Sequence, residues 1–294
     1  MKFIFMNLNF LKKTKPFLAL GRYNYPTGGF LLMWPCFWGV FYQLNFDTDF
    51  IKYLILFFVG SFVMRGAGCC INDYFDRDLD KKVSRTKSRP LASNALSTRN
   101  AFYFILLQLL IGFAVVINLN AKAIFFSFLI IPVIIIYPLL KRVSNYPQLF
   151  LGIAFNWGVL VGFATQNDYF SSGLIFLFLG GVFLTIAYDT IYAFQDINDD
   201  KRIGIGSLAI ILEKNSKKYI LLIFIISYLF FTFSLLYLKH LGFLASLILS
   251  IPVLVSFLFQ YKLFVTRKSY KLVFDSNVYT GGLITSILLL SNYF

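Results

Sequence analysis

The division of the sequence into long apolar runs constrains the fold more than any other feature of the chain. Hydrophobic residues make up 59% of the 294 residues and charged residues only 14%, which is far from the balance of a soluble domain. A helix that crosses a bilayer needs about 20 mostly apolar residues. Windows of that length predict nine spanning helices, at residues 26–44, 51–71, 101–119, 121–140, 149–164, 174–194, 219–238, 241–259 and 278–294. The sequence therefore predicts an all-α, polytopic membrane protein.

The basic residues indicate the orientation of these helices. Nine spans place alternate connections on opposite sides of the membrane, and Lys and Arg mark the cytoplasmic side. The connections on the other side contain only Lys52, Lys122 and Lys239. We expect one transmembrane domain over residues 1–294, with a cytoplasmic segment at residues 1–20. The net charge of +14 then faces membrane lipid and indicates no nucleic acid partner.

An acidic cluster follows the second predicted span. Asn72, Asp76 and Asp80 are four residues apart, so in a helix they share one face. Carboxylate and amide oxygens at a helix end suit Mg²⁺ bridged to substrate phosphates. An ordinary solvated loop has the same composition, so this cluster does not decide the function by itself.

A second acidic cluster ends the sixth predicted span. Asp189 lies inside the span, and Asp196, Asp199 and Asp200 follow it. Asp196 and Asp200 again share a helical face. Both clusters fall on the same predicted side of the membrane, which favours a shared function over two unrelated loops. Together they indicate a site for one diphosphate group.

Basic residues near the clusters complete this prediction, because a departing diphosphate needs positive charge. Arg77, Lys141 and Arg142 are candidates, although each has the alternative of an interfacial anchor. Arg65 lies about two turns inside the second span, and a charge at that depth is costly and usually functional, with snorkelling as the alternative. Arg22 marks either the mouth of the same cavity or an interfacial anchor.

These residues carry a specific resemblance. The chain resembles the UbiA superfamily of intramembrane aromatic prenyltransferases. The first superfamily motif, NDxxDxxxD, is matched by Asn72, Asp73, Asp76 and Asp80, and the second, DxxxD, by Asp196 and Asp200. Flanking matches lie at residues 64–69, 88–91, 137–142 and 199–205. Residues 146–157 resemble the 4-hydroxybenzoate polyprenyltransferase branch, whereas residues 23–28 depart from the usual L-D-x-P-I-G pattern.

The resemblance implies nine helices around a central cavity that opens laterally to lipid. It implies transfer of a polyprenyl group from its diphosphate to C3 of 4-hydroxybenzoate in ubiquinone biosynthesis, with Mg²⁺ as cofactor. The implied metal ligands are Asn72, Asp76, Asp196 and Asp200. The implied catalytic residues are Asp76, Asp196, Arg77, Lys141 and Arg142. The implied substrate-binding residues are Arg22, Arg65, Asp73, Asp80, Tyr137, Asp189 and Asp199.

Other functions remain open at this point. A sister enzyme of the same fold would attach the prenyl group to haem, homogentisate or dihydroxynaphthoate. A transporter would also have many spans and a buried charge, although transporters usually hold ionisable groups near the midplane. CDP-alcohol phosphotransferases use acidic motifs with Mg²⁺, but their DGxxAR motif is absent from this sequence.

The expected location is a bacterial cell inner membrane, because the N-terminal residues contain no Arg-rich transit segment. A mitochondrial inner membrane is the alternative. Other proteins of quinone biosynthesis are candidate partners.

Overall fold

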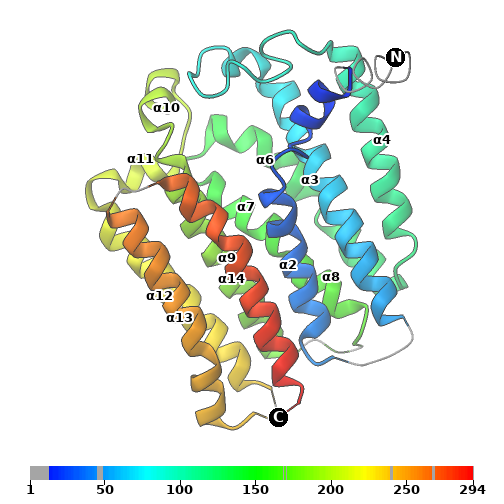
Figure 1. The fold of residues 1–294 in the computed structure, drawn as a ribbon, viewed down its shortest axis with the longest axis vertical. Coiled ribbons are helices and arrows are strands. Elements are labelled where there is room, and N and C mark those ends of the chain that lie inside the picture. The colour runs from blue at the N-terminus through cyan, green and yellow to red at the C-terminus, as the bar shows by residue number, and fades with distance from the viewer. Residues whose placement is uncertain are drawn as a thin grey trace, which may run out of the picture.

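The structure is a computed structural model that describes residues 13–44, 49–167, 169, 171–238, 241–266 and 269–293, with the side chains of residues 138–143 excluded. All regular structure in these residues is helical. Figure 1 shows most of the helices running along one long axis, with the C-terminal end at the bottom and α10 at the top.

Seven helical segments in the described part of the chain are long and apolar enough to cross a membrane. They are α3 (Phe50–Asp80), α4 (Thr98–Val116), α7 with α8 (Pro147–Asn156 and Gly158–Ala164), α9 (Ser172–Ala193), α11 with η1 and α12 (Leu208–Leu212, Glu213–Asn215 and Ser216–Leu236), α13 (Phe243–Val265) and α14 (Tyr270–Ser291). Two shorter apolar segments are α2 (Thr27–Phe41) and the pair α5 and α6 (Ala121–Leu129 and Ile131–Val143). Each of the nine predicted runs therefore contains a helix.

The boundaries differ from the prediction in several places. The second predicted span continues to Asp80, so the first acidic motif is helical throughout. The fourth predicted span breaks at Ile130, two residues before Pro132, whose ring removes a backbone donor. The fifth is divided at Trp157 into α7 and α8. The last predicted span begins eight residues too late, because α14 starts at Tyr270.

Serine side chains set the starts of several helices. The hydroxyl of Ser97 accepts a hydrogen bond from the backbone N–H of Asn100 at the start of α4. Ser171 and Ser269 cap α9 and α14 in the same way. Each cap satisfies one of the backbone donors that a helix leaves open in its first turn.

Helix α9 is the most enclosed candidate span, and it contacts α7, α12 and α14. Helix α2 contacts α14 and α9, and it also contacts α3 and α8. The main apolar core joins these helices around side chains such as Trp38, Phe163 and Leu177. Because α2, α3, α9 and α14 converge, the ends of these helices can share one site.

Candidate active site

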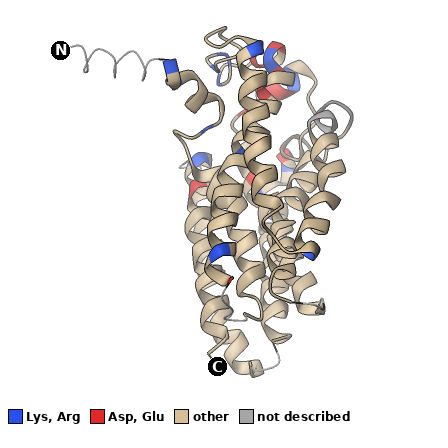
Figure 2. Cartoon of the chain, turned by 90° about the vertical axis from the view of Figure 1, so that its right-hand side faces the viewer, with Lys and Arg blue, Asp and Glu red and all other residues tan. Residues whose placement is uncertain are grey.

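The charged positions gather at one end of the bundle. Figure 2 shows most Lys, Arg, Asp and Glu positions at the top, where α3 ends and α10 (Ile197–Ile203) lies. The last turns of α3 contain Asn72, Asp73, Asp76 and Asp80. Asp73 is only 1% exposed and Asp80 only 7%. Carboxylates this deeply buried require partners.

Arginines from two loops supply those partners. Arg22 donates to both oxygens of Asp73, at 2.9 and 2.8 Å. Arg89 bridges Asp73 and Asp80, at 3.1 and 2.9 Å. Arg22 has a left-handed backbone conformation, with φ 59°, and this turn directs its side chain back toward α3. The buried part of the first motif is therefore tied to both the N-terminal loop and the loop after α3.

The second acidic motif lies on a separate short helix. Helix α9 ends at Ala193, and Asp196 precedes the first residue of α10. Arg85 donates through Nε to both carboxylate oxygens of Asp196, at 2.8 and 3.0 Å, and through Nη2 at 2.5 Å. Partial removal from water lowers the pKa of the Arg85 guanidinium, but the hydrogen bonds and charge of Asp196 together outweigh this effect, so the pKa is raised.

The loop after α3 joins the two motifs through further contacts. The backbone N–H of Ser84 donates to Asp199 at 3.1 Å, and Arg202 donates to the carbonyl of Lys82 at 3.0 Å. Arg202 also pairs with Asp199 at 3.1 Å. The two acidic motifs thus lie at the same end of the bundle. This agrees with the prediction that both lie on one side of the membrane.

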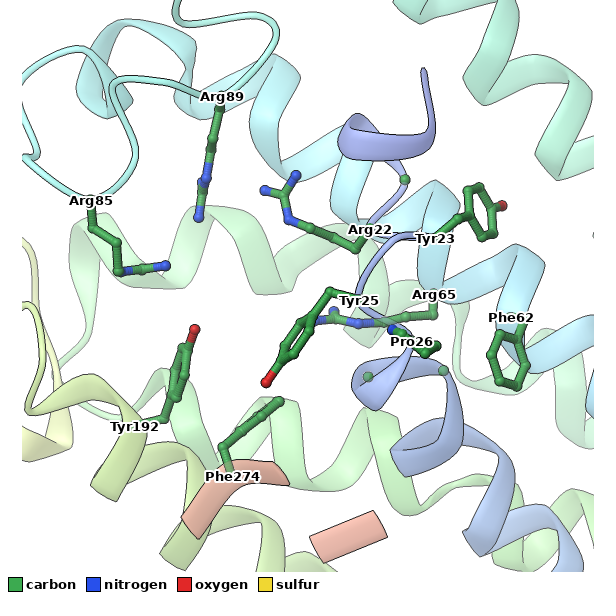
Figure 3. A pocket seen from close by; sticks show the side chains of 13 residues that line it. Arg22, Tyr23, Tyr25, Pro26, Phe62, Arg65, Arg85, Arg89, Tyr192 and Phe274 are labelled. Atoms are coloured by element: carbon green, nitrogen blue, oxygen red, sulfur yellow. The ribbon is translucent and has the colours of Figure 1, made fainter. Parts of the chain in front are cut away.

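A cavity of about 150 Å³ lies between these elements. Four arginines line it, Arg22, Arg65, Arg85 and Arg89, and no carboxylate is among the described side chains of its lining. Figure 3 shows Arg85 and Arg89 pointing down from the loop and Tyr192 pointing up toward them. Tyr25, Phe62 and Phe274 complete an aromatic wall. A cavity with several guanidinium groups and aromatic walls suits an aromatic or phosphorylated anion.

Arg65 is the one of these four arginines that lies inside a candidate membrane span, α3. Its Nε is buried without a hydrogen-bond partner among the described residues, and its guanidinium lies 5.4 Å from the centre of the Phe155 ring. Tyr188 and Asp189 lie in its surroundings. A Cβ on Gly28 would lie 2.4 Å from Nε, so only glycine leaves this space for Arg65. A buried donor without a partner at a cavity wall is a candidate ligand contact.

The residues present fit a magnesium ion. The side-chain Oδ1 of Asn72 is buried and has no hydrogen-bond partner in the described part of the chain, and an amide oxygen is a suitable hard ligand. No group of three or more His, Cys, Asp or Glu side chains within the described residues is arranged to hold a metal. Mg²⁺ is commonly held by one or two carboxylates together with water and substrate phosphates, so such a group is not required.

The remaining predicted residues have different positions. Arg77 lies 5.6 Å from the Tyr74 ring centre and 3.7 Å from Asp78, and it does not line the cavity. The side chains of Lys141 and Arg142 lie outside the described residues. Tyr137 and Asp189 lie in the surroundings of the Arg65 guanidinium. Arg85, Tyr25 and Tyr192 line the cavity but are not among the residues predicted from the sequence, whereas Arg89 stands before Pro90 in a matched flanking segment.

An apolar groove lies beside the cavity and shares α2 and α3 with it. Its volume is about 310 Å³, and its lining includes Leu32, Met64, Phe113, Ile134 and Trp157. Gly60 and Gly112 lie on facing walls, on α3 and α4. A long hydrocarbon chain matches such a lining.

The sequence pattern of the UbiA prenyltransferase family matches residues 32–273. The chain belongs to this family. The UbiA identity predicted from the two acidic motifs is therefore confirmed. The structure carries the corresponding fold. It resembles that of a UbiA homologue from Aeropyrum pernix K1, with a TM-score of 0.74 and 24% identity over 90% of this chain and 97% of that one.

A UbiA homologue from Archaeoglobus fulgidus bound to GPP and Mg²⁺ has a similar fold, with a TM-score of 0.73 and 15% identity over 95% and 98% of the two chains. Curated UbiA relatives are more similar in sequence. The mitochondrial 4-hydroxybenzoate polyprenyltransferase of Drosophila pseudoobscura is 44% identical, over 70% of this chain and 53% of the relative. The 4-hydroxybenzoate octaprenyltransferase of Shewanella sp. (strain ANA-3) is 41% identical, over 72% and 74%. The chain spans about half the length of the insect relatives that it matches.

Proposed function

We propose that the chain transfers a polyprenyl group from polyprenyl diphosphate to C3 of 4-hydroxybenzoate and releases diphosphate, as a step of ubiquinone biosynthesis. One observation carries the proposal: a cavity lined by four arginines adjoins an apolar groove. The cavity suits the anionic groups of both substrates, and the groove suits the prenyl tail. The names of the relatives support this choice of substrates.

The donor diphosphate is proposed to bind at the end of the cavity where Arg85 and Arg89 lie. Both side chains come from the loop after α3 and line the cavity. Guanidinium groups bind phosphate oxygens in a bidentate manner and stabilise the charge that develops on a leaving group. Arg77, Lys141 and Arg142 remain proposed contributors to the same positive field.

Mg²⁺ is proposed to bind at Asn72, Asp76, Asp196 and Asp200, with one or two of these carboxylates to an ion and with water and the diphosphate as the other ligands. When bound, the ion neutralises charge on the diphosphate and so favours its departure. The buried, unpaired Oδ1 of Asn72 supports this assignment. Asp73 and Asp80 are proposed to act indirectly, since their ion pairs orient Arg22 and Arg89, and Asp199 is proposed to hold the loop through Ser84.

The acceptor carboxylate is proposed to bind Arg65, with Tyr137 and Asp189 as neighbours that orient this guanidinium. The bond between C1 of the prenyl group and its diphosphate oxygen breaks, and a bond forms between C1 and C3 of the acceptor ring. The proton on C3 then passes to water or to the departing diphosphate, and the ring becomes aromatic again. Aromatic side chains such as Tyr25 and Phe274 stabilise the allylic cation and exclude water from it.

The membrane arrangement is also proposed. We infer nine spans, from the seven long candidate segments and the two shorter apolar ones, around a cavity that opens to lipid through the apolar groove. The charged end is proposed to face the cytoplasm. A bacterial inner membrane is the proposed location; the relatives are both bacterial and mitochondrial. Association with other quinone-biosynthesis proteins is proposed as well.

One assay tests the function. Purified protein is incubated with Mg²⁺, a polyprenyl diphosphate and labelled 4-hydroxybenzoate, and the prenylated product is measured. We expect product with Mg²⁺, none with excess EDTA, and recovery on adding Mg²⁺ back. Product from homogentisate, dihydroxynaphthoate or haem instead would indicate a sister enzyme. No product from any acceptor would contradict the proposal.

A matched pair of variants connects the assay to the acidic motif. Asp76→Asn removes one proposed metal ligand charge. Asp78→Asn removes a carboxylate two residues away whose side chain is 72% exposed and pairs with Lys81. We expect the first variant to lose most of the transfer activity and the second to retain it. Equal activities in the two variants would count against the proposed metal site.

A further inference from the structure

Tyr25 is a cavity residue whose hydroxyl is held from outside the cavity. Its side chain lines the cavity, and its hydroxyl donates a hydrogen bond to Oδ1 of Asp275 on α14. Asp275 itself is not among the described side chains that line the cavity. The carboxylate is therefore placed to act on the cavity only through the tyrosine.

The same carboxylate oxygen binds a second residue from the start of α2. Thr27 donates its hydroxyl to Oδ1 of Asp275 at 3.0 Å. On α14, one turn before Asp275, Lys271 places Nζ 4.5 Å from the centre of the Tyr25 ring. Three contacts thus join residues 25–27 to α14, and together they define the position and tilt of one aromatic ring.

The residue next to Asp275 continues the aromatic wall. Phe274 lines the cavity, and its ring centre lies 4.7 Å from that of Tyr192 and 5.5 Å from that of Tyr188. Figure 3 shows the hydroxyl end of Tyr25 directed toward Phe274, and Tyr25, Phe274 and Arg65 line the same cavity. The ring held by Asp275 therefore lies in the wall of the cavity that Arg65 also lines.

The local sequence explains why a special restraint is needed here. Tyr25 follows a tight turn in which Arg22 is left-handed, and its backbone N–H donates to the carbonyl of Arg22 at 2.9 Å. Residues 21–26 are turn and bend between a helical stretch that ends at residue 20 and the start of α2, so no helix backbone of its own restricts the rotamer of the Tyr25 ring. Residues 23–28 are also the segment that departs from the usual superfamily pattern.

We propose that Asp275 is a positioning residue for the aromatic acceptor, which it orients by holding the Tyr25 ring against the acceptor ring. This inference rests on the proposed prenyl transfer and adds a determinant of acceptor binding to it. Tyr25 contacts the acceptor and Asp275 acts through Tyr25. The proposed donor residues, Arg85 and Arg89, line the same cavity but come from the loop after α3, whereas the residues that hold Tyr25 lie on α2 and α14.

The test measures steady-state transfer with the acceptor and the donor varied in turn, for Asp275→Ala, Asp275→Asn and Tyr25→Phe. Loss of one hydrogen bond that orients a contact ring is expected to raise the acceptor KM of Asp275→Ala about fivefold. The donor KM and kcat are expected to stay within about twofold. Asp275→Asn is expected to restore the acceptor KM, because an amide oxygen still accepts from both hydroxyls. Tyr25→Phe is expected to behave as Asp275→Ala does.

Two matched controls separate positioning from a general loss of structure. Asp49→Ala removes a half-exposed carboxylate just before α3 that pairs with Lys52 in the first turn of that helix. Tyr279→Phe removes a hydroxyl from an 81% exposed tyrosine of α14. Both are expected to retain wild-type kinetics. An unchanged acceptor KM in Asp275→Ala would overturn the inference, and so would an equal rise in both KM values or a failure of Asp275→Asn to restore the acceptor KM.

The wild-type protein separates this inference from the proposed function. If the wild type prenylates homogentisate or dihydroxynaphthoate in place of 4-hydroxybenzoate, the proposed substrate is wrong, and the same variants are compared with the acceptor that is used. If the wild type has activity and the acceptor KM does not respond, only the role of Asp275 is wrong. A wild type without activity on any aromatic acceptor overturns both.

Discussion

Arg85 and Asp196 form the contact that connects the loop after α3 to the second acidic motif. Arg85→Ala is expected to lower kcat/KM for the donor by at least about tenfold, because it removes charge-assisted hydrogen bonds from the proposed diphosphate site. Arg85→Lys is expected to recover only part of the activity, since an ammonium group lacks the bidentate geometry of a guanidinium. Steady-state kinetics with varied donor check both.

The control for this prediction is Arg99→Ala. Arg99 is exposed and lies 5.8 Å from the centre of the Tyr103 ring on α4, away from the cavity lining. Wild-type donor kinetics in Arg99→Ala together with a defect in Arg85→Ala would assign the effect to the site. Equal defects would assign it to net charge instead.

Arg65 is the residue that we expect to bind the acceptor carboxylate. Arg65→Ala is expected to raise the acceptor KM roughly tenfold or more, because a hydrogen bond to a charged group contributes on the order of 1.5 to 3 kcal/mol. An unchanged acceptor KM would contradict the assignment of Arg65 to the acceptor carboxylate.

The sequence could predict the acidic residues but not most of their partners. Asn72, Asp76 and Asp80 share a helical face whatever the rest of the chain does, because the spacing alone decides it. The ion pair of Arg85 with Asp196 joins residues 111 positions apart, and it depends on how the loop folds over α10. No motif or spacing in the sequence marks Tyr25. Its contacts are with Asp275 and Lys271 on α14, about 250 residues away in the chain.

At the scale of helices, the contact between α2 and α8 depends on glycine. A Cβ on Gly162 would lie 2.1 Å from the carbonyl oxygen of Cys36, and one on Gly39 would lie 2.1 Å from that of Val159. Small residues allow membrane helices to approach this closely. Gly162→Ala is expected to destabilise the protein by roughly 1 to 3 kcal/mol through overpacking, seen as a lower thermal midpoint in detergent.

Gly68→Ala is the matched control within α3. A Cβ there would meet no atom within 4 Å, and alanine favours a helix by about 1 kcal/mol over glycine. Its thermal midpoint is expected to stay equal or rise. A lower midpoint in both variants, or in neither, would contradict the role given to close packing of α2 and α8.

Hydropathy predicted where the helices are but not where they begin, end or break. The second predicted span stops at residue 71 because the residues beyond it are polar, yet α3 continues to Asp80. Ion pairs with Arg22 and Arg89 stabilise that polar extension. A hydropathy average does not include ion pairs between distant residues, so it could not predict the extension. At Trp157 the backbone keeps helical angles, φ −56° and ψ −25°, so α7 and α8 continue each other as one span, Pro147–Ala164.

At the scale of the whole molecule, the charge distribution and the site agree. The basic connections that the sequence assigns to one side lie at the end of the bundle where both acidic motifs meet. A membrane protein oriented by its positive residues would then present the polar cavity to the cytoplasm, where a small water-soluble acceptor and Mg²⁺ are available. The tail of the donor stays in lipid, beside the apolar groove.

This orientation is tested with single cysteines and a membrane-impermeant maleimide on intact cells. Cys36, Cys69 and Cys70 are buried, so the parent protein is expected to remain unlabelled and serves as the control. Gly242→Cys, at the end of the bundle remote from the acidic motifs, is expected to react in intact cells. Ala95→Cys, in the loop after α3, is expected to react only after the membrane is permeabilised. Labelling of Ala95→Cys in intact cells would show the opposite orientation. The proposed site would then face away from the cytoplasm, where no cytoplasmic acceptor reaches it.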